Sequence, residues 1–227
     1  MLRDFLDQGD AAEADWVPHL LRLANRGDLG DGGGGLLLDL PALAQPYGCG
    51  PAACTPGLRS KTARSCCADL EVTPGPDERA RIEARLPELS AFLAARDPRW
   101  ERGAPEVFDG DSLRRPGRRC VFSITGPDGL RCGLQLAEAE LGPLKPTACQ
   151  MFPLAVVELY DDQVLLTAVH KSTARLLSSR PARVFPCLGA GSVTLAEAER
   201  PVLNRLLGTR RALRVVRAVQ EWREASA

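Results

Sequence analysis

Apolar residues recur at helical spacing along residues 77–95. Four positions share one helical face: Ile82, Leu86, Leu89 and Leu93. Their spacings of four, three and four residues are typical of a helix with one buried side. Pro87 interrupts this pattern and lacks a backbone donor, so it should kink or split the helix.

Helices are also predicted at both ends of the chain. Residues 1–26 are expected to be helical, and Asn25-Arg26-Gly27 forms a plausible stop. Near the other end, Thr194 and Glu197 have the spacing of a capping box, and the helix that follows should end at Gly208. The last helix, over 210–224, carries an apolar stripe that should face the core: Leu213, Val216, Val219 and Trp222.

Between these ends, short apolar runs separated by turn residues predict strands. Leu36–Leu40 is one candidate strand. Two hairpins are predicted. The first has arms 120–124 and 130–134 with a turn at 127–129, and the second has arms 152–160 and 164–169 with a turn at 161–163. A short helix over 135–141 is expected to lie between the hairpins.

The remaining segments are expected to be loops. Asp28–Gly35 is glycine-rich but lacks the spacing of a phosphate-binding loop, so it is interpreted as a flexible connector. Residues 41–76 contain six prolines, and 97–119 is polar. We therefore expect an α+β fold, in which a small antiparallel sheet of hairpins is flanked by helices and the loop-rich part is stapled by metal-bound cysteines.

Three parts are predicted within the 227 residues: an N-terminal helical segment with its connector (1–40), a cysteine-cluster metal-binding domain (41–190), and C-terminal helices that pack on it (191–227). The 29 basic and 29 acidic residues cancel, which argues against nucleic acid or an anionic membrane as the partner. No apolar run approaches the ~20 residues of a membrane helix, and the N-terminus does not resemble a secretory signal. The expected location is the cytoplasm.

Eight cysteines stand out in a chain assigned to a reducing compartment: Cys49, Cys54, Cys66, Cys67, Cys120, Cys132, Cys149 and Cys187. Clustered cysteines in such a compartment are more often metal ligands or catalytic thiols than disulfides. Thiolates suit zinc and iron–sulfur clusters, and the glycines and prolines around them leave backbone N–H groups able to point at sulfur. All eight are therefore candidate metal ligands.

The spacing leaves the metal open between zinc and an iron–sulfur cluster. It contains neither the paired C-x-x-C knuckles of a zinc ribbon nor the C-x2-C-x2-C run of a bacterial ferredoxin. Eight cysteines exceed the needs of one zinc ion, which favours a cluster slightly. Since the adjacent side chains of Cys66 and Cys67 diverge, one should ligate while the other packs or serves a second metal.

The order of the cysteine segments resembles the YkgJ-type cysteine-cluster family, described as zinc- or iron-chelating domains, and especially its longer relatives. The resemblance covers about residues 49–170. Its pieces are Cys49-x4-Cys54 with Cys66-Cys67, Val72-Thr73-Pro74, Cys120-Val-Phe122, Cys132, and Lys145-Pro146-Thr-Ala-Cys149-Gln-Met-Phe152-Pro153. The resemblance implies a metal centre, and it matches Cys187 and His170 loosely to a late cysteine and histidine of that family.

Other interpretations of these residues remain open. The thiols could form disulfides or be inert and buried. His170 could serve as a ligand or proton carrier, whereas His19 is interpreted as structural. The pairs Asp109/Asp111 and Asp161/Asp162 are interpreted as solvated turn residues.

Three functions therefore compete: a metal-binding protein with a structural or delivery role, a metal- or cluster-dependent enzyme, and a zinc-stapled adaptor for a protein partner.

Overall fold

The structure of the chain is a computed structural model that describes residues 13–50, 66, 70–117, 119–126, 129–177 and 181–226. The chain divides into two compact units. Unit 1 takes its residues from Met1–Gly48 and Met151–Ala227, and unit 2 is Cys49–Gln150. This division differs from the predicted parts 1–40, 41–190 and 191–227, because the N-terminal and C-terminal segments share one sheet and one core.

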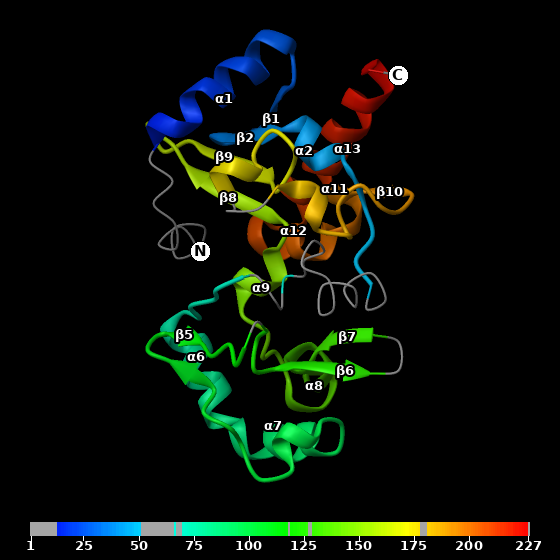
Figure 1. Cartoon of the computed structure of the whole chain (residues 1–227). Helices are drawn as coiled ribbons and strands as arrows, with labels where there is room; N and C mark the ends of the chain where they lie inside the picture. The colour runs from blue at the N-terminus through cyan, green and yellow to red at the C-terminus, as the bar shows by residue number, and fades with distance from the viewer. Residues whose placement is uncertain are drawn as a thin grey trace. The chain divides into compact units, whose positions relative to one another are not determined.

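The centre of unit 1 is a four-stranded sheet with the strand order β1-β2-β9-β8 (Figure 1). Its strands are β1 (Leu29–Gly33), β2 (Leu36–Asp39), β8 (Leu154–Glu158) and β9 (Val164–Ala168). β1 pairs with β2, and β8 with β9, in antiparallel hairpins. The central pair, β2 and β9, is parallel, with Leu36 opposite Val164 and Leu38 opposite Leu166. Strands from the two ends of the chain therefore hold unit 1 together.

Side chains of this sheet alternate between two apolar clusters, as the period of two in a strand requires. In β2, Leu36 and Leu38 pack in the larger cluster, whereas Leu37 packs in the smaller one. In β9, Leu166 enters the larger cluster and Leu165 the smaller one. Both faces of the sheet are therefore covered.

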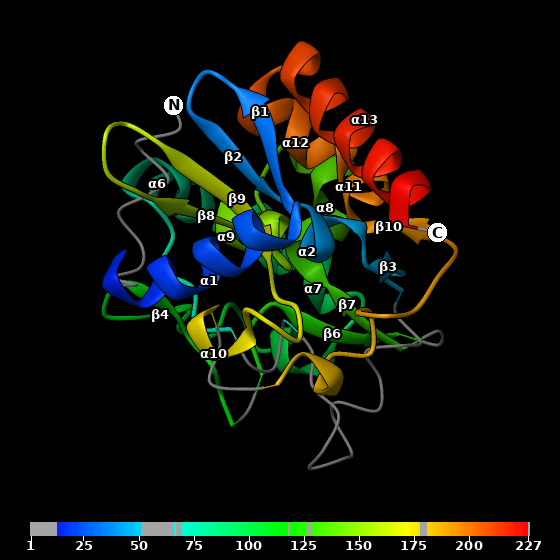
Figure 2. The ribbon, with the colours of Figure 1, turned by 90° about the horizontal axis from the view of Figure 1, so that it is seen from above.

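Helices cover both faces of this sheet. The helices of unit 1 are α1 (Glu13–Arg26), α2 (Leu40–Ala44), α10 (Ala174–Leu177), α11 (Leu195–Ala198), α12 (Arg200–Leu207) and α13 (Thr209–Ser226). Trp16 of α1 and Leu177 of α10 pack in the smaller cluster, and α2, α11, α12 and α13 contribute to the larger one. Figure 2 shows α1 crossing in front of the sheet. Two short strands, β3 (Pro46–Tyr47) and β10 (Val193–Thr194), pair beside these helices.

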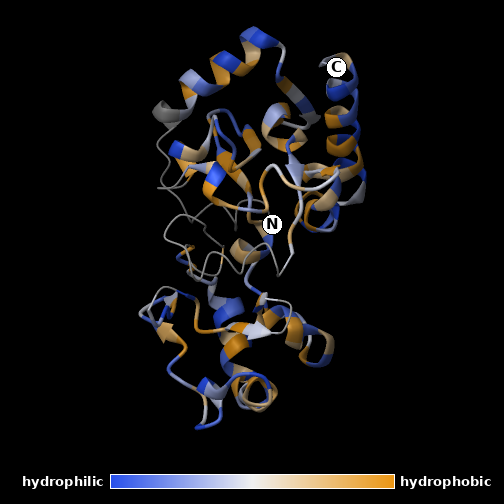
Figure 3. Cartoon of the chain, turned by 45° about the vertical axis from the view of Figure 1, so that its right-hand side comes forward, coloured by the Kyte–Doolittle hydropathy of each residue, from blue (hydrophilic) through white to orange (hydrophobic). Residues whose placement is uncertain are grey.

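The amphipathic pattern of the long helices is visible in their colouring (Figure 3). In α13 the fully buried positions are Ala212, Val215 and Val219, whereas Leu213 is 44 % exposed. The predicted stripe was therefore wrong at Leu213. The core face lies one position earlier along the first half of the helix, at Ala212 and Val215.

A buried polar group joins α1 to the sheet of unit 1. Asp39, the last residue of β2, is fully buried and accepts hydrogen bonds from Thr167 Oγ1 at 2.8 Å and from Ala42 N at 3.2 Å. His19 Nε2 lies 2.8 Å from the same carboxylate. Asp39 thereby caps α2 and ties together three elements.

Unit 2 combines short helices and hairpins around its own apolar cluster. Its described elements are α6 (Pro76–Ala84), α7 (Leu86–Ala94), the 3-10 turn η2 (Pro98–Trp100), β4 (Phe108–Asp109), β5 (Ser112–Leu113), β6 (Ser123–Gly126), β7 (Gly129–Cys132), α8 (Gly133–Leu141) and α9 (Thr147–Met151). The last residue of α9, Met151, is the first residue of the second segment of unit 1. Its fully buried residues include Ile82, Leu89, Leu93 and Phe122. The first three belong to the predicted apolar stripe, and Pro87 splits that helix into α6 and α7 as expected.

The α+β fold class with small antiparallel hairpins is confirmed. Some segments predicted as loops contain secondary structure. The glycine-rich connector contains strand β1, because glycine backbones pair with β2 and Gly33, Gly34 and Gly35 close the hairpin at positive φ. Residues 41–76 were predicted to be mostly loop, and the structure forms two short elements there, β3 and most of α2, which Asp39 caps.

Candidate metal centre

Cys120 and Cys132 meet at one end of the β6–β7 hairpin in unit 2. Cys120 precedes β6 in a turn, where its carbonyl accepts hydrogen bonds from Ser123 N at 3.0 Å and Ser123 Oγ at 2.7 Å. Ser123 pairs directly with Cys132 in the ladder. The strand predicted to begin at Cys120 therefore begins at Ser123, and the turn brings the two cysteines to the same end of the hairpin.

Cys132 also stands at the start of α8. Gly133, the next residue, donates its backbone N–H to Phe122 O at 2.8 Å. A Cβ atom at Gly133 would lie 2.8 Å from that carbonyl and 2.6 Å from Leu93 Cδ2, so only glycine fits here without movement. The helix α8 can therefore lie this close to the turn that contains Cys120 only because residue 133 is a glycine.

Cys149 lies in the short helix α9, which packs against the same apolar cluster. Two carboxylates hold the segment that leads into α9. Glu138 Oε1 accepts from Leu144 N at 3.1 Å and from Lys145 N at 2.8 Å. Glu78 Oε1 accepts from Thr147 N at 2.9 Å. The position of Cys149 is therefore determined from α8 and α6 together.

Cys66 and Cys49 complete the described cysteines of unit 2. Cys66 is half-buried, and its carbonyl accepts a hydrogen bond from Leu70 N at 3.1 Å. Cys49 is exposed. Cys54 and Cys67 lie outside the described residues.

The thiols of unit 2 influence one another electrostatically, which places them in one neighbourhood. Burial raises the pKa of Cys149, and the neighbouring sulfurs of Cys132, Cys120 and Cys66 raise that pKa further. Burial likewise raises the pKa of Cys120 to about 12, with contributions from Cys132 and Cys66. Four segments of the chain, carrying Cys66, Cys120, Cys132 and Cys149, therefore converge.

Backbone amides and the ammonium group of Lys145 oppose part of the rise in the pKa of these thiols. Burial raises the pKa of Cys132, and the backbone N–H groups of Gln135 and Leu134 at the start of α8 oppose that shift. Burial would lower the pKa of Lys145, but the sulfurs of Cys132, Cys66 and Cys149 outweigh burial and leave that pKa raised. Lys145 Nζ also donates to Gln135 Oε1 at 3.3 Å. These groups therefore offset part of the cost of negative charge on sulfur, while burial and the neighbouring sulfurs keep the pKa values of Cys120, Cys132 and Cys149 raised.

The donor set fits a soft metal in its chemistry, because it consists of several half-buried thiols with amides and an ammonium group near them. Within the ranges that the structure describes, no three Cys, His, Asp or Glu side chains lie close enough to hold a metal ion.

The other predicted site residues lie in unit 1. Cys187 is buried in the larger apolar cluster with Phe185 and Leu195. Both histidines of the chain lie near Asp39: His19 contacts it directly, and the charge of Asp39 opposes the effect of burial, which lowers the pKa of His170. His170 Nδ1 lies 2.7 Å from Ser172 Oγ.

The aspartate pairs occupy turns, as their sequence context indicates. Asp161 and Asp162 adopt positive φ angles of 56° and 57° between β8 and β9, and both are exposed. Asp109 and Asp111 belong to the β4–β5 hairpin, where Asp111 Oδ1 lies 3.5 Å from Arg79 Nη1.

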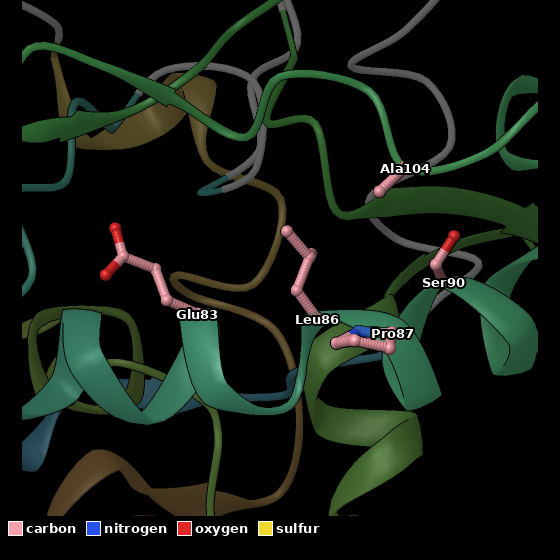
Figure 4. Close-up of a pocket in the computed structure, with 5 residues that line it drawn as sticks. All are labelled: Glu83, Leu86, Pro87, Ser90 and Ala104. Atoms are coloured by element: carbon pink, nitrogen blue, oxygen red, sulfur yellow. The ribbon is translucent and has the colours of Figure 1, made fainter.

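An open depression of about 410 Å³ lies where α6 meets α7 (Figure 4). Its described lining residues are Glu83, Leu86, Pro87, Ser90 and Ala104. Glu83 is the single ionisable side chain among them, and no cysteine is included. The depression lacks convergent polar groups of the kind that bind a small ligand.

Sequence reasoning missed the two carboxylates that hold the Cys149 segment. Lys145 belongs to the sequence signature at 145–153 that contains Cys149, so its proximity to that cysteine could have been anticipated. Glu78 and Glu138 have no such signal, because each reaches α9 or the preceding turn from a separate helix.

Comparison with known proteins adds no relative, because no family model, no curated protein and no solved structure matches the chain. None of the helices in the described ranges combines the length and apolarity needed to cross a membrane.

Proposed function

We propose that unit 2 binds a zinc ion or an iron–sulfur cluster through its cysteines. The observation that carries this proposal is the convergence of four thiols from separate segments, Cys66, Cys120, Cys132 and Cys149. Cys49, Cys54 and Cys67 are further candidate ligands. Cys187 is left out of the proposed set, since it packs in the core of unit 1.

Chemistry supports a metal over inert thiols. Buried free cysteines usually behave as small apolar side chains, whereas here neighbouring sulfurs add to burial in raising the pKa of Cys120, Cys132 and Cys149. A bound metal replaces the thiol protons and removes this cost. The ammonium group of Lys145 would offset part of the negative charge that four thiolates bring.

Metal binding also suits the construction of unit 2. Among its described residues the secondary structure consists of short elements, the longest being nine-residue helices. Such elements have little stability of their own, and crosslinking them through a metal contributes directly to folding. Binding through the described cysteines requires a movement that brings their sulfurs to coordinating distance. A reducing compartment, the cytoplasm, belongs to the proposal because it keeps the thiols available.

The test is metal analysis of protein purified without oxygen. A zinc content of about one per chain, or iron with acid-labile sulfide and absorbance near ~400 nm, would support the proposal and decide between the two centres. Cys149→Ser should lose metal, while the control Cys187→Ala, which removes a thiol from unit 1, should keep it. Folded wild-type protein without metal that also fails to take up zinc or iron would refute the proposal.

A further inference from the structure

The carboxylate of Glu78 bridges two helices of unit 2. Glu78 lies in the first turn of α6, and its Oε2 accepts from the backbone N–H of Gly75, the residue before the helix, at 3.1 Å. Its Oε1 accepts from Thr147 N at 2.9 Å and from Thr147 Oγ1 at 2.5 Å. One side chain therefore caps the start of α6 and also holds the first residue of α9.

The second of these roles concerns the residue that starts α9. The first N–H groups of a helix have no partner within it, and negative charge is favourable at that end. Glu78 provides both an acceptor and a negative charge at Thr147. Because α9 has only five residues, it depends on such external contacts for its position.

Cys149 lies two residues after Thr147 in α9. On the other side of Thr147, Glu138 holds the backbone of Leu144 and Lys145 against α8. If the Glu78 contact is lost, the turn before α9 stays attached while the helix that carries Cys149 is released. Cys120 and Cys132 belong to the β6–β7 hairpin and its turn, which Glu78 does not contact in the described structure.

We propose that Glu78 is a positioning residue that sets the place of Cys149 within the thiol cluster. The inference rests on the metal-binding function proposed above. It assigns Glu78 an effect on one ligand of the centre, through Thr147, and no effect on the ligands of the hairpin. Residues that orient metal ligands in this way typically change metal affinity about 10- to 100-fold when removed.

The test uses the full chain, reduced and freed of metal, then loaded with Zn²⁺. Each cysteine is alkylated with and without Zn²⁺, and its modification is measured by peptide mass spectrometry. For Glu78→Ala we expect Cys149 to lose its protection by Zn²⁺ while Cys120 and Cys132 keep theirs, with Zn²⁺ affinity about 10- to 100-fold lower. Glu78→Gln retains an acceptor oxygen and should restore most of the protection.

Glu83→Ala is the matched control, because Glu83 lies in the same helix and pairs with Arg79 on the surface. It should behave as wild type. Thr147→Val removes one of the two hydrogen bonds and serves as a second variant should Glu78→Ala fail to fold. It should weaken the protection of Cys149 alone.

The outcomes separate the two proposals. If neither Zn²⁺ nor iron supplied with sulfide protects any cysteine of the wild-type chain, the metal-binding function fails. If Zn²⁺ protects the wild-type cysteines, and Glu78→Ala either protects Cys149 equally well or loses all protection at once while folded, the positioning role of Glu78 is wrong and metal binding stands.

Discussion

His19 Nε2 lies 2.8 Å from Asp39 Oδ2, and both side chains are almost completely buried. The contact joins α1 to the end of β2, and Thr167 of β9 donates to the same oxygen. His19, which the sequence suggested to be a structural histidine, thus belongs to a buried polar group at the centre of unit 1.

Replacing Asp39 with alanine should destabilise unit 1 severely. The substitution leaves His19, Thr167 Oγ1 and the backbone N–H of Ala42 without their shared acceptor, and each buried polar group left unsatisfied costs about 1–3 kcal/mol. Chemical denaturation combined with hydrogen exchange of β2 and α2 would measure the loss. Asp31→Ala, at an exposed position in β1, is the control, and an equal effect of the two variants would contradict the prediction.

A side chain at Gly133 should disturb unit 2. Gly133→Ala places a Cβ atom 2.6 Å from Leu93 Cδ2 and 2.8 Å from Phe122 O. The second neighbour is backbone and cannot rotate away, so we expect a cost of about 1–3 kcal/mol. Thermal or denaturant unfolding would measure it. Gly126→Ala, whose new atom would meet nothing closer than 3.8 Å, should change stability far less.

Asp97 should make stability depend on pH in the acid range. Burial raises its pKa, but hydrogen bonds from Arg99 and the charge of Arg99 outweigh burial and leave the pKa below its ordinary value. A group whose pKa is lower in the folded state stabilises it above the unfolded pKa of about 3.9, and this contribution is lost as pH falls through the folded value.

The measurement is the difference in unfolding free energy between wild type and Asp97→Asn from pH 7 to pH 3. That difference should be largest near neutral pH and should shrink as the solution is acidified below about pH 4. A difference that stays constant or grows on acidification would show that Arg99 does not lower the pKa of Asp97.

The capping box of α11 should contribute measurably to unit 1. Thr194 Oγ1 accepts from Glu197 N at 3.2 Å, and Glu197 Oε2 accepts from Thr194 N at 2.9 Å. Thr194→Ala should cost about 1 kcal/mol. Thr194→Ser, which keeps the hydroxyl, should recover most of the loss in the same unfolding experiment. If serine and alanine were equally destabilising, the hydroxyl would not be the stabilising group.

Much of the secondary structure could be predicted because its signals are local. The Pro87 interruption, the second hairpin with its Asp161-Asp162 turn, the short helix over 135–141 and the capping box at Thr194 all follow from residues close together in the chain. The pairing of β2 with β9 could not be predicted in this way. It depends on a parallel register between distant segments, and no turn sequence encodes it.

The candidate site shows the same limit. The residue types and the order of the cysteine segments indicated a metal centre, and the structure brings Cys66, Cys120, Cys132 and Cys149 into one neighbourhood. Whether they bind metal stays a prediction. The roles of Glu78 and Glu138 required three-dimensional contacts, because a glutamate in a helix is usually a solvated residue and neither position differs from that pattern in sequence.

The parallel pairing of β2 with β9 has a consequence for the order in which the protein is made. A ribosome finishes β1 and β2, then the whole of unit 2, before β8 and β9 exist. During that interval β2 has only β1 as a partner, and a lone two-stranded hairpin is marginally stable in water. Unit 2 is thus the first part of the chain whose residues have all been made, and a chain cut short near residue 150 would contain every residue of unit 2 but only half of the unit 1 sheet.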